Sequence, residues 1–298
     1  MTEKQRHLVL FFAQWAASLL ICWRSFVETF SLSLHNDEYT YILLILPVTT
    51  TLILLERRSL YTMAAFAIRP GAGLLAGALA IGLSMRVWAA QIAPDVHLSM
   101  TMLALVLAWI GSFVVSFGLR AARSALFPLL FLFGMVPLPR NLLDTVITLL
   151  QQGSAWTAHG LFTLFGIPVD QSGVLLTIPD LTVQVSQECS SIRSSSMLLV
   201  TTIVLAQILL RTRWHKAVVI ALAVPLSIFK NGLRIFVIAM LGTKVDPGYL
   251  TGRLHRHGGI IFFVIALTGV FALICWFQRQ EGPVPMELKT VKAAVGGD

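Results

Sequence analysis

The chain has 298 residues, of which 56% are hydrophobic and only 12% charged, and its mean hydropathy is +0.81. Soluble domains carry about 25% charged residues, so this composition excludes a soluble globular protein and predicts an integral membrane protein. The formal charge of +8 comes from basic residues clustered in short loops between apolar runs. Such residues set topology and face anionic lipid, so we expect a lipid bilayer as partner and no nucleic acid.

Apolar runs long enough to cross about 30 Å of hydrocarbon predict an all-α polytopic protein with about eight transmembrane helices. We expect the spans at residues 8–23, 40–55, 72–92, 99–117, 124–138, 194–210, 216–241 and 259–277. Residues 142–166 mix polar side chains with leucine and phenylalanine, which favours an interfacial or re-entrant helix. We expect one transmembrane domain over residues 1–278 and a disordered cytosolic tail over residues 279–298.

The basic residues also predict the orientation of the chain. With the N-terminus inside, 13 of the 22 lysines and arginines fall in cytoplasmic segments, as the positive-inside rule requires. We therefore expect a multi-pass protein of the inner (plasma) membrane with both termini cytoplasmic. The largest extracytoplasmic region is then residues 139–193.

A small β-hairpin is expected in the second half of that region. Residues 173–178 and 181–186 are rich in branched side chains and flank the turn dipeptide Pro179-Asp180. Such a hairpin would deliver the chain to Cys189 at a fixed place over the membrane.

Cys189 lies just before an apolar helix, whose N-terminal dipole favours thiolate over thiol. The nearby serines 190, 191 and 194–196 are candidate helix caps, and Arg193 adds a cation, whereas the charge of Glu188 opposes the thiolate. The other two cysteines, Cys22 and Cys275, lie in apolar segments, and this scattered odd number gives no disulfide framework. The alternative is that Cys189 only fills a niche at the helix end.

Arg234 lies inside the next span, where an arginine normally faces a protein interior or an aqueous cavity. Lys230 and Asn231 lie on nearby turns and give this helix a polar face. Arg234 can donate to the oxyanion that forms when a thiolate attacks an amide carbonyl. The alternatives are an anchor that reaches toward the lipid headgroups and a partner for Glu188.

His255 and His257 precede the last span, and an interfacial histidine can shuttle protons near neutral pH. The alternative is a polar residue at the membrane border. No third ligand has a helpful spacing, so we expect no metal and no cofactor. A thiol, a guanidinium and an imidazole on consecutive spans, all on the extracytoplasmic side, are the parts needed for acyl transfer.

These motifs, in this order, resemble the exosortase/archaeosortase family of membrane cysteine transpeptidases. They are Glu188-Cys189-Ser190-Ser191-Ile192, Asn231-Gly232-Leu233-Arg234, and His255 followed by Gly259 and Phe263. The resemblance covers roughly residues 100–277. Ser191 stands where the family usually has glycine, and His257 competes with His255, whose spacing to Gly259 and Phe263 fits better.

The resemblance implies a cysteine protease and transpeptidase with a thioester intermediate. Cys189 is then the nucleophile, Arg234 the oxyanion stabiliser and His255 the acid. The implied substrates are membrane-anchored proteins with a C-terminal sorting signal of the PEP-CTERM type. They would be cleaved on the outer face and passed to an unidentified acceptor, linked to polysaccharide or lipid.

Two other functions fit the same sequence. A transporter or channel for an anionic solute would use Arg86, Lys230 and Arg234 as a polar route. A non-catalytic factor for polysaccharide export would keep the fold but would not need the thiol.

Overall fold

Long apolar helices make up most of the structure, because inside lipid the backbone polar groups must be satisfied within each segment. The computed structural model describes residues 3–63, 65–179, 181–185, 192–251 and 259–282. Within these ranges, six helices are long and apolar enough to cross a membrane. Two further pairs of helices are each bent at a short break, and the number of spans rises to eight if each pair counts as one span. The expected all-α polytopic membrane protein is confirmed.

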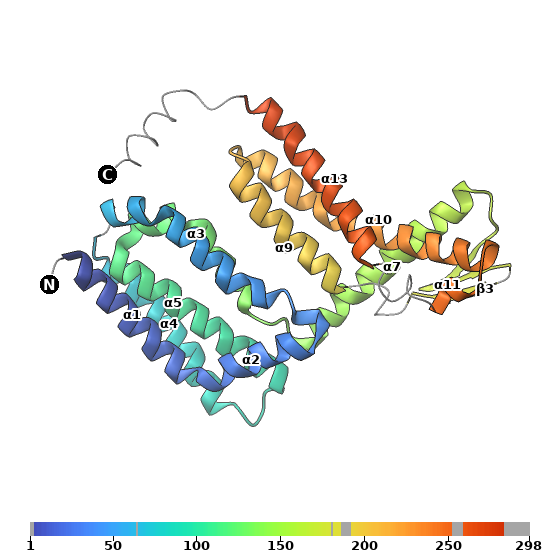
Figure 1. The fold of residues 1–298 in the computed structure, drawn as a ribbon. Helices are drawn as coiled ribbons and strands as arrows, with labels where there is room; N and C mark the ends of the chain where they lie inside the picture. Colours follow the sequence, from blue (N-terminus) through green and yellow to red (C-terminus); the bar gives the residue numbers. More distant parts are fainter. Residues whose placement is uncertain (1–2, 64, 180, 186–191, 252–258, 283–298) are drawn as a thin grey trace. The chain divides into compact units, whose positions relative to one another are not determined.

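The chain forms two compact units, residues 1–145 and 146–298. The described residues of unit 1 form five long helices, three short ones and the start of a further long helix, which can be followed in Figure 1. They are α1 (Glu3–Ile21), α2 (Trp23–His35), η1 (Asp37–Tyr39), α3 (Ile42–Thr62), α4 (Ile68–Val87), α5 (Pro94–Ser124), α6 (Leu126–Phe131), η2 (Leu132–Met135) and the start of α7 (Arg140–Leu164). The single domain expected over residues 1–278 stays a prediction.

The first expected span continues further than its hydropathy suggested. We expected it to end at residue 23, but after a bend of 76° the chain resumes as helix α2. Arg24 and Glu28 end the apolar run but lie inside this second helix, because helix formation depends on backbone hydrogen bonds and not on hydropathy.

Helix α5 is broken at Gly118, whose backbone is in the left-handed region (φ 85°). A Cβ there would lie 2.2 Å from the carbonyl oxygen of Ala65, so only glycine fits. The carbonyls freed by the break find new donors: Ala65 N–H donates to Phe117 at 3.1 Å and Ala67 N–H to Val115 at 3.3 Å. The break is therefore part of the fold and matches the expected end of this span at residue 117.

The start of α7 is tied to the rest of unit 1. The backbone N–H of Arg140 donates to Asp95 Oδ2 at 2.7 Å, and Tyr39 and Ser99 donate to the carbonyls of Leu138 and Pro137. The expected span 124–138 is only residues 126–135, and a bend of 98° separates it from α7. Pro137 and Pro139 lie in the bend, where they cannot continue a helix.

In its described residues, unit 2 contains most of α7 and three further long helices, and these three lie side by side in Figure 1. They are α9 (Ile192–Leu209), α10 (Arg213–Lys244) and α13 (Gly259–Gln280), with the short α11 (Gly248–Thr251) after α10. Their shared core consists of small and branched side chains and one phenylalanine: Leu198, Ala206, Leu210, Val219, Ala266, Val270, Ile274 and Phe277. Because α10 runs opposite to the other two, its carboxyl-terminal half meets the first turns of both.

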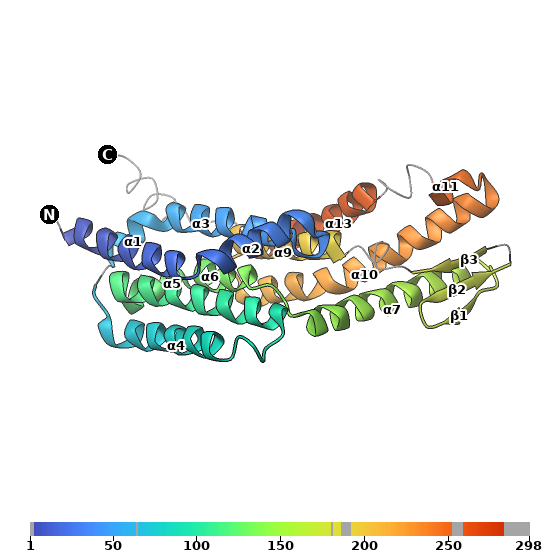
Figure 2. The same ribbon diagram turned by 90° about the horizontal axis from the view of Figure 1, so that it is seen from below.

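The expected hairpin is present and carries an additional strand. Strands β2 (Leu175–Ile178) and β3 (Leu181–Gln184) pair antiparallel, with Ile178 opposite Leu181, and β1 (Asp170–Ser172) pairs with β2. The sheet lies beside α7 and α10 (Figure 2). Leu176, Ile178 and Val185 are buried in one cluster with side chains of these two helices.

Candidate functional site

The carboxyl-terminal half of α10 has a buried polar face. Ser227 precedes Lys230 and Asn231 by three and four residues, and Arg234 follows them by four and three, so all four lie on one side of the helix. Lys230 is 4% exposed, Asn231 0% and Arg234 9%. Placing an arginine within a span costs roughly 2.5–3.5 kcal/mol on insertion scales. Such a cluster therefore needs partners inside the protein.

The first turn of α9 supplies partners for this face. Lys230 Nζ donates to Ser194 Oγ, and Ser227 Oγ donates to Ser195 Oγ at 2.7 Å. Of the five serines expected as candidate caps, Ser190 and Ser191 lie outside the described residues. Ser195 accepts from α10 instead, and Ser196 donates back to the carbonyl of Ile192 at 2.8 Å. The serine run thus fixes the first turn of α9 against α10.

The first residue of α13 lies beside the guanidinium of Arg234. A Cβ added to Gly259 would be 3.8 Å from Arg234 Nη1. Because Gly259 has no side chain, the guanidinium can lie close to the backbone at the start of α13. The polar face of α10 therefore meets the beginnings of both neighbouring helices, with Lys230 toward α9 and Arg234 toward α13.

Helix α7 supports the other side of α10 through glycine contacts. A Cβ on Gly232 would lie 2.5 Å from Thr157 Cβ and 3.0 Å from the carbonyl oxygen of Ser154. A Cβ on Gly153 would lie 2.9 Å from Ile228 Cγ2. Small residues let helix backbones approach closely in membranes. Gly232 lies two residues before Arg234, so this contact fixes the position of the polar face.

The hairpin is fixed to the same support. Gln151 Nε2, on α7, donates to the carbonyl of Val185 at 3.0 Å, and Val185 N–H donates to the carbonyl of Val174 at 2.9 Å. Val185 is the last described residue before the segment that contains Cys189. The described chain is thus anchored before this segment by Gln151 and after it by Lys230.

The structure places some of the expected site residues and leaves others open. Glu188, Cys189, His255 and His257 lie outside the described residues. Arg193 is exposed on the first turn of α9, and Arg86 is exposed in the last turn of α4. The described part of the chain contains no group of three His, Cys, Asp or Glu residues that could hold a metal ion. No local pattern in the sequence predicts that Ser194 binds Lys230, because the contact joins residues 36 positions apart.

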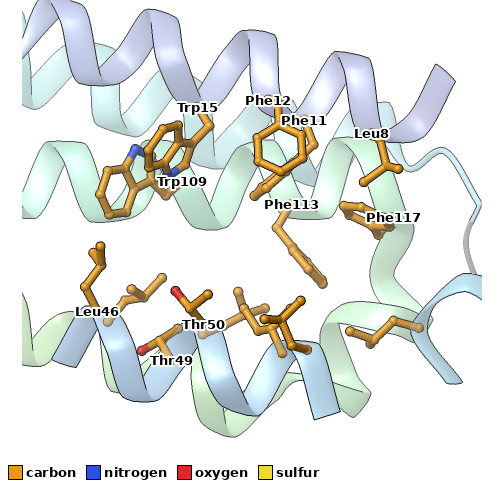
Figure 3. A pocket seen from close by; sticks show the side chains of 15 residues that line it. Leu8, Phe11, Phe12, Trp15, Leu46, Thr49, Thr50, Trp109, Phe113 and Phe117 are labelled. Carbon is orange, nitrogen blue, oxygen red and sulfur yellow. The ribbon is translucent and has the colours of Figure 1, made fainter. Parts of the chain in front are cut away.

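Unit 1 contains an apolar cavity of about 670 Å³ among α1, α3 and α5 (Figure 3). Trp15 and Trp109 stack at one end, with ring centroids 5.2 Å apart. Among the described residues that line it, Thr49 and Thr50 carry the only hydroxyls, and none has a thiol, a carboxylate or an imidazole. This cavity therefore lacks groups for acyl-transfer chemistry, and α10 remains the candidate site.

Comparison with known proteins agrees with the motifs. The family model described as transmembrane exosortase (Exosortase_EpsH) matches residues 23–272, which include all three motifs. No curated protein and no solved structure matches the chain.

Proposed function

The chain belongs to the transmembrane exosortase family, and we propose that it is a membrane-embedded cysteine protease and transpeptidase. It cleaves C-terminal sorting signals of exported proteins at the outer membrane–water boundary and transfers the new C-terminus to an acceptor. We place it in the inner membrane with its site extracytoplasmic. The observation that carries this proposal is the buried face of α10, where Lys230 binds the first turn of α9 and Arg234 lies against the start of α13.

Covalent geometry supports the assembly of the site. A chain extends at most about 3.6 Å per residue. Because Cys189 precedes Ser194 by five residues, their Cα atoms are within about 18 Å of each other. His255 precedes Gly259 by four residues, and the same bound is about 14 Å. The thiol and the imidazole are therefore on short tethers to the residues that contact Lys230 and Arg234.

The proposed reaction has two acyl-transfer steps. The Cys189 thiolate attacks the scissile carbonyl carbon, and Arg234 N–H groups donate to the resulting oxyanion. The carbon–nitrogen bond then breaks as the His255 imidazolium protonates the leaving amine, which leaves a thioester. An acceptor hydroxyl, an amine or water gives a proton to His255 and attacks the thioester, which releases the product and restores the thiolate.

Co-expression with a substrate tests this function. The substrate is an exported reporter that ends in a Pro-Glu-Pro motif, an apolar helix and a basic cluster. We expect processing by the parent protein and none by Cys189→Ala, at equal amounts in the membrane, with Cys275→Ala as the matched control. Processing by Cys189→Ala at the parent rate would refute the assignment. Parallel His255→Ala and His257→Ala variants identify which histidine acts.

The anion carrier is less well supported. A permeation route needs side chains open to the solute, but Lys230 is buried and bound to Ser194. Arg86 is exposed on the surface of unit 1. We therefore do not propose a transporter or channel for an anionic solute.

A further inference from the structure

Lys230 is a buried cation with a hydroxyl partner. Its side chain is 4% exposed, and its Nζ donates to Ser194 Oγ. No carboxylate pairs with it in the described part of the chain. A buried ammonium without an anion is costly, so its retention in the middle of a span points to a role for its charge.

In the part of the chain that the structure describes, helices α9 and α10 carry no acidic side chain, and their charged side chains are positive. Arg234 lies one helical turn further along α10, and Arg193 lies on the first turn of α9. Helix α13 brings no charged side chain before Arg279, at its far end. The free N–H groups at the start of α9 add partial positive charge. An anion near the first turn of α9 is therefore stabilised from several directions.

The two buried cations face different segments. Arg234 Nη1 lies near Gly259, at the start of α13, and Lys230 Nζ is held by Ser194, on α9. Ser194 follows Cys189 by five residues. Val185, which is held by Gln151, precedes Cys189 by four residues. Lys230 is thus the buried cation fixed to the helix that follows the nucleophile.

We propose that Lys230, bound to Ser194, is a positioning residue that holds the segment after Cys189 and stabilises its thiolate. This rests on the function proposed above, since it takes Cys189 as the nucleophile. Arg234 then serves the oxyanion and Lys230 the resting nucleophile. The competing anion is Glu188, and neutralising it distinguishes the two partners.

Alkylation of the thiol tests this role without any substrate. In a Cys22→Ala/Cys275→Ala background, Cys189 is the only thiol. An uncharged, impermeant maleimide linked to polyethylene glycol labels it in native membranes across a range of pH. Because the reagent is neutral, removing a lysine changes the reactivity of the thiol and not the attraction of the reagent.

We expect Lys230→Met to slow labelling at pH 7 about tenfold, with the parent rate recovered about one pH unit higher, since one unit of pKa is a tenfold change in thiolate. Lys230→Arg keeps the charge and stays close to the parent rate. Ser194→Ala loses the anchor and gives an intermediate rate. Lys244→Met, which removes an exposed lysine from the same helix, is the matched control and leaves the profile unchanged.

Three results overturn the proposal. The first is a Lys230→Met profile that coincides with the parent. The second is slow labelling at every pH, which indicates lost access and not lost thiolate. The third is that Glu188→Gln cancels the effect of Lys230→Met, because Lys230 then serves that carboxylate. If instead the profile shifts as expected but sorting substrates stay intact, the proposed function fails and the role of Lys230 stands.

Discussion

The guanidinium of Arg234 and the backbone of Gly259 lie against each other, so that a Cβ on the glycine would be 3.8 Å from Nη1. This links the middle of α10 to the first residue of α13, 25 positions later in the chain. This contact holds the buried Arg234 against the start of α13, the helix that two histidines precede in the sequence.

A branched side chain at Gly259 is expected to disturb this contact. Alanine fits, because a Cβ at 3.8 Å is an ordinary van der Waals distance, whereas the Cγ atoms of valine would meet the guanidinium. We expect Gly259→Val to slow substrate processing in the co-expression assay and Gly259→Ala to have little effect. Equal activity of both variants would show that this contact does not position Arg234.

Replacing Arg234 should impair processing even when the charge is kept. Loss of one donor to an oxyanion typically lowers a rate about 100- to 1000-fold, and we expect this range for Arg234→Gln. Arg234→Lys restores only part of it, because an ammonium is a point charge and not a planar fork. The initial rate of substrate cleavage at equal enzyme levels is the measurement. Arg279→Lys, an exposed site on α13, is the control, and a fully active Arg234→Lys contradicts the donor role.

Gly232→Ala should destabilise unit 2. The added methyl would meet Thr157 Cβ at 2.5 Å and the Ser154 carbonyl at 3.0 Å, and overpacking of this kind costs about 1–3 kcal/mol. The matched control is Gly160→Ala on α7, where a Cβ meets nothing within 4 Å. Thermal unfolding in detergent should show a lower midpoint for Gly232→Ala alone. Equal midpoints for the two variants contradict the close contact of α7 with α10.

Glu281, which follows the last residue of α13, connects the end of this helix to the start of α10. Its carboxylate accepts the N–H groups of Arg211 and Thr212, each at 2.9 Å, and lies 2.8 Å from His215 Nδ1. Burial alone would raise the pKa of Glu281, but the hydrogen bonds from Thr212, Arg211 and His215 outweigh it and lower this pKa from 4.5 to about 2.

The lowered pKa predicts how stability depends on pH. The folded state binds the proton of Glu281 more weakly than the unfolded state, so the carboxylate stabilises the fold fully above about pH 4.5. This contribution is lost as the pH falls toward 2. Glu281→Ala should lower the free energy of unfolding at pH 7, by about 1.5–3 kcal/mol for hydrogen bonds to a charged group, and with it the unfolding midpoint. It should also reduce the loss of stability between pH 4.5 and 2. Arg279→Gln is the control, and an unchanged midpoint in Glu281→Ala contradicts the role of this contact.

Several boundaries could be predicted because local chemistry sets them. The hairpin follows from branched residues around Pro179, and the strands begin and end within two residues of the expected positions. Residue 117 was the expected end of a span because the apolar run stops there, and Gly118 breaks the helix at that point.

Other elements depend on pairing and could not be predicted. Strand β1 has the sequence Asp170-Gln171-Ser172, which has neither alternation nor branched residues, and it exists because β2 offers an edge. Helix α2 was missed because the apolar run ends at Arg24, whereas a second helix starts at Trp23 and extends to His35.

The sequence by itself determined that this chain lies in a membrane, that most of it is helical, and that a thiol, an arginine and two histidines occur in motifs beside or inside consecutive apolar segments. Composition and motif order carry this information without a fold. Only the tertiary structure decided that Lys230 binds Ser194 and that Arg234 lies against Gly259. These partners are 36 and 25 positions apart, and only the antiparallel packing of α10 with α9 and α13 brings them together.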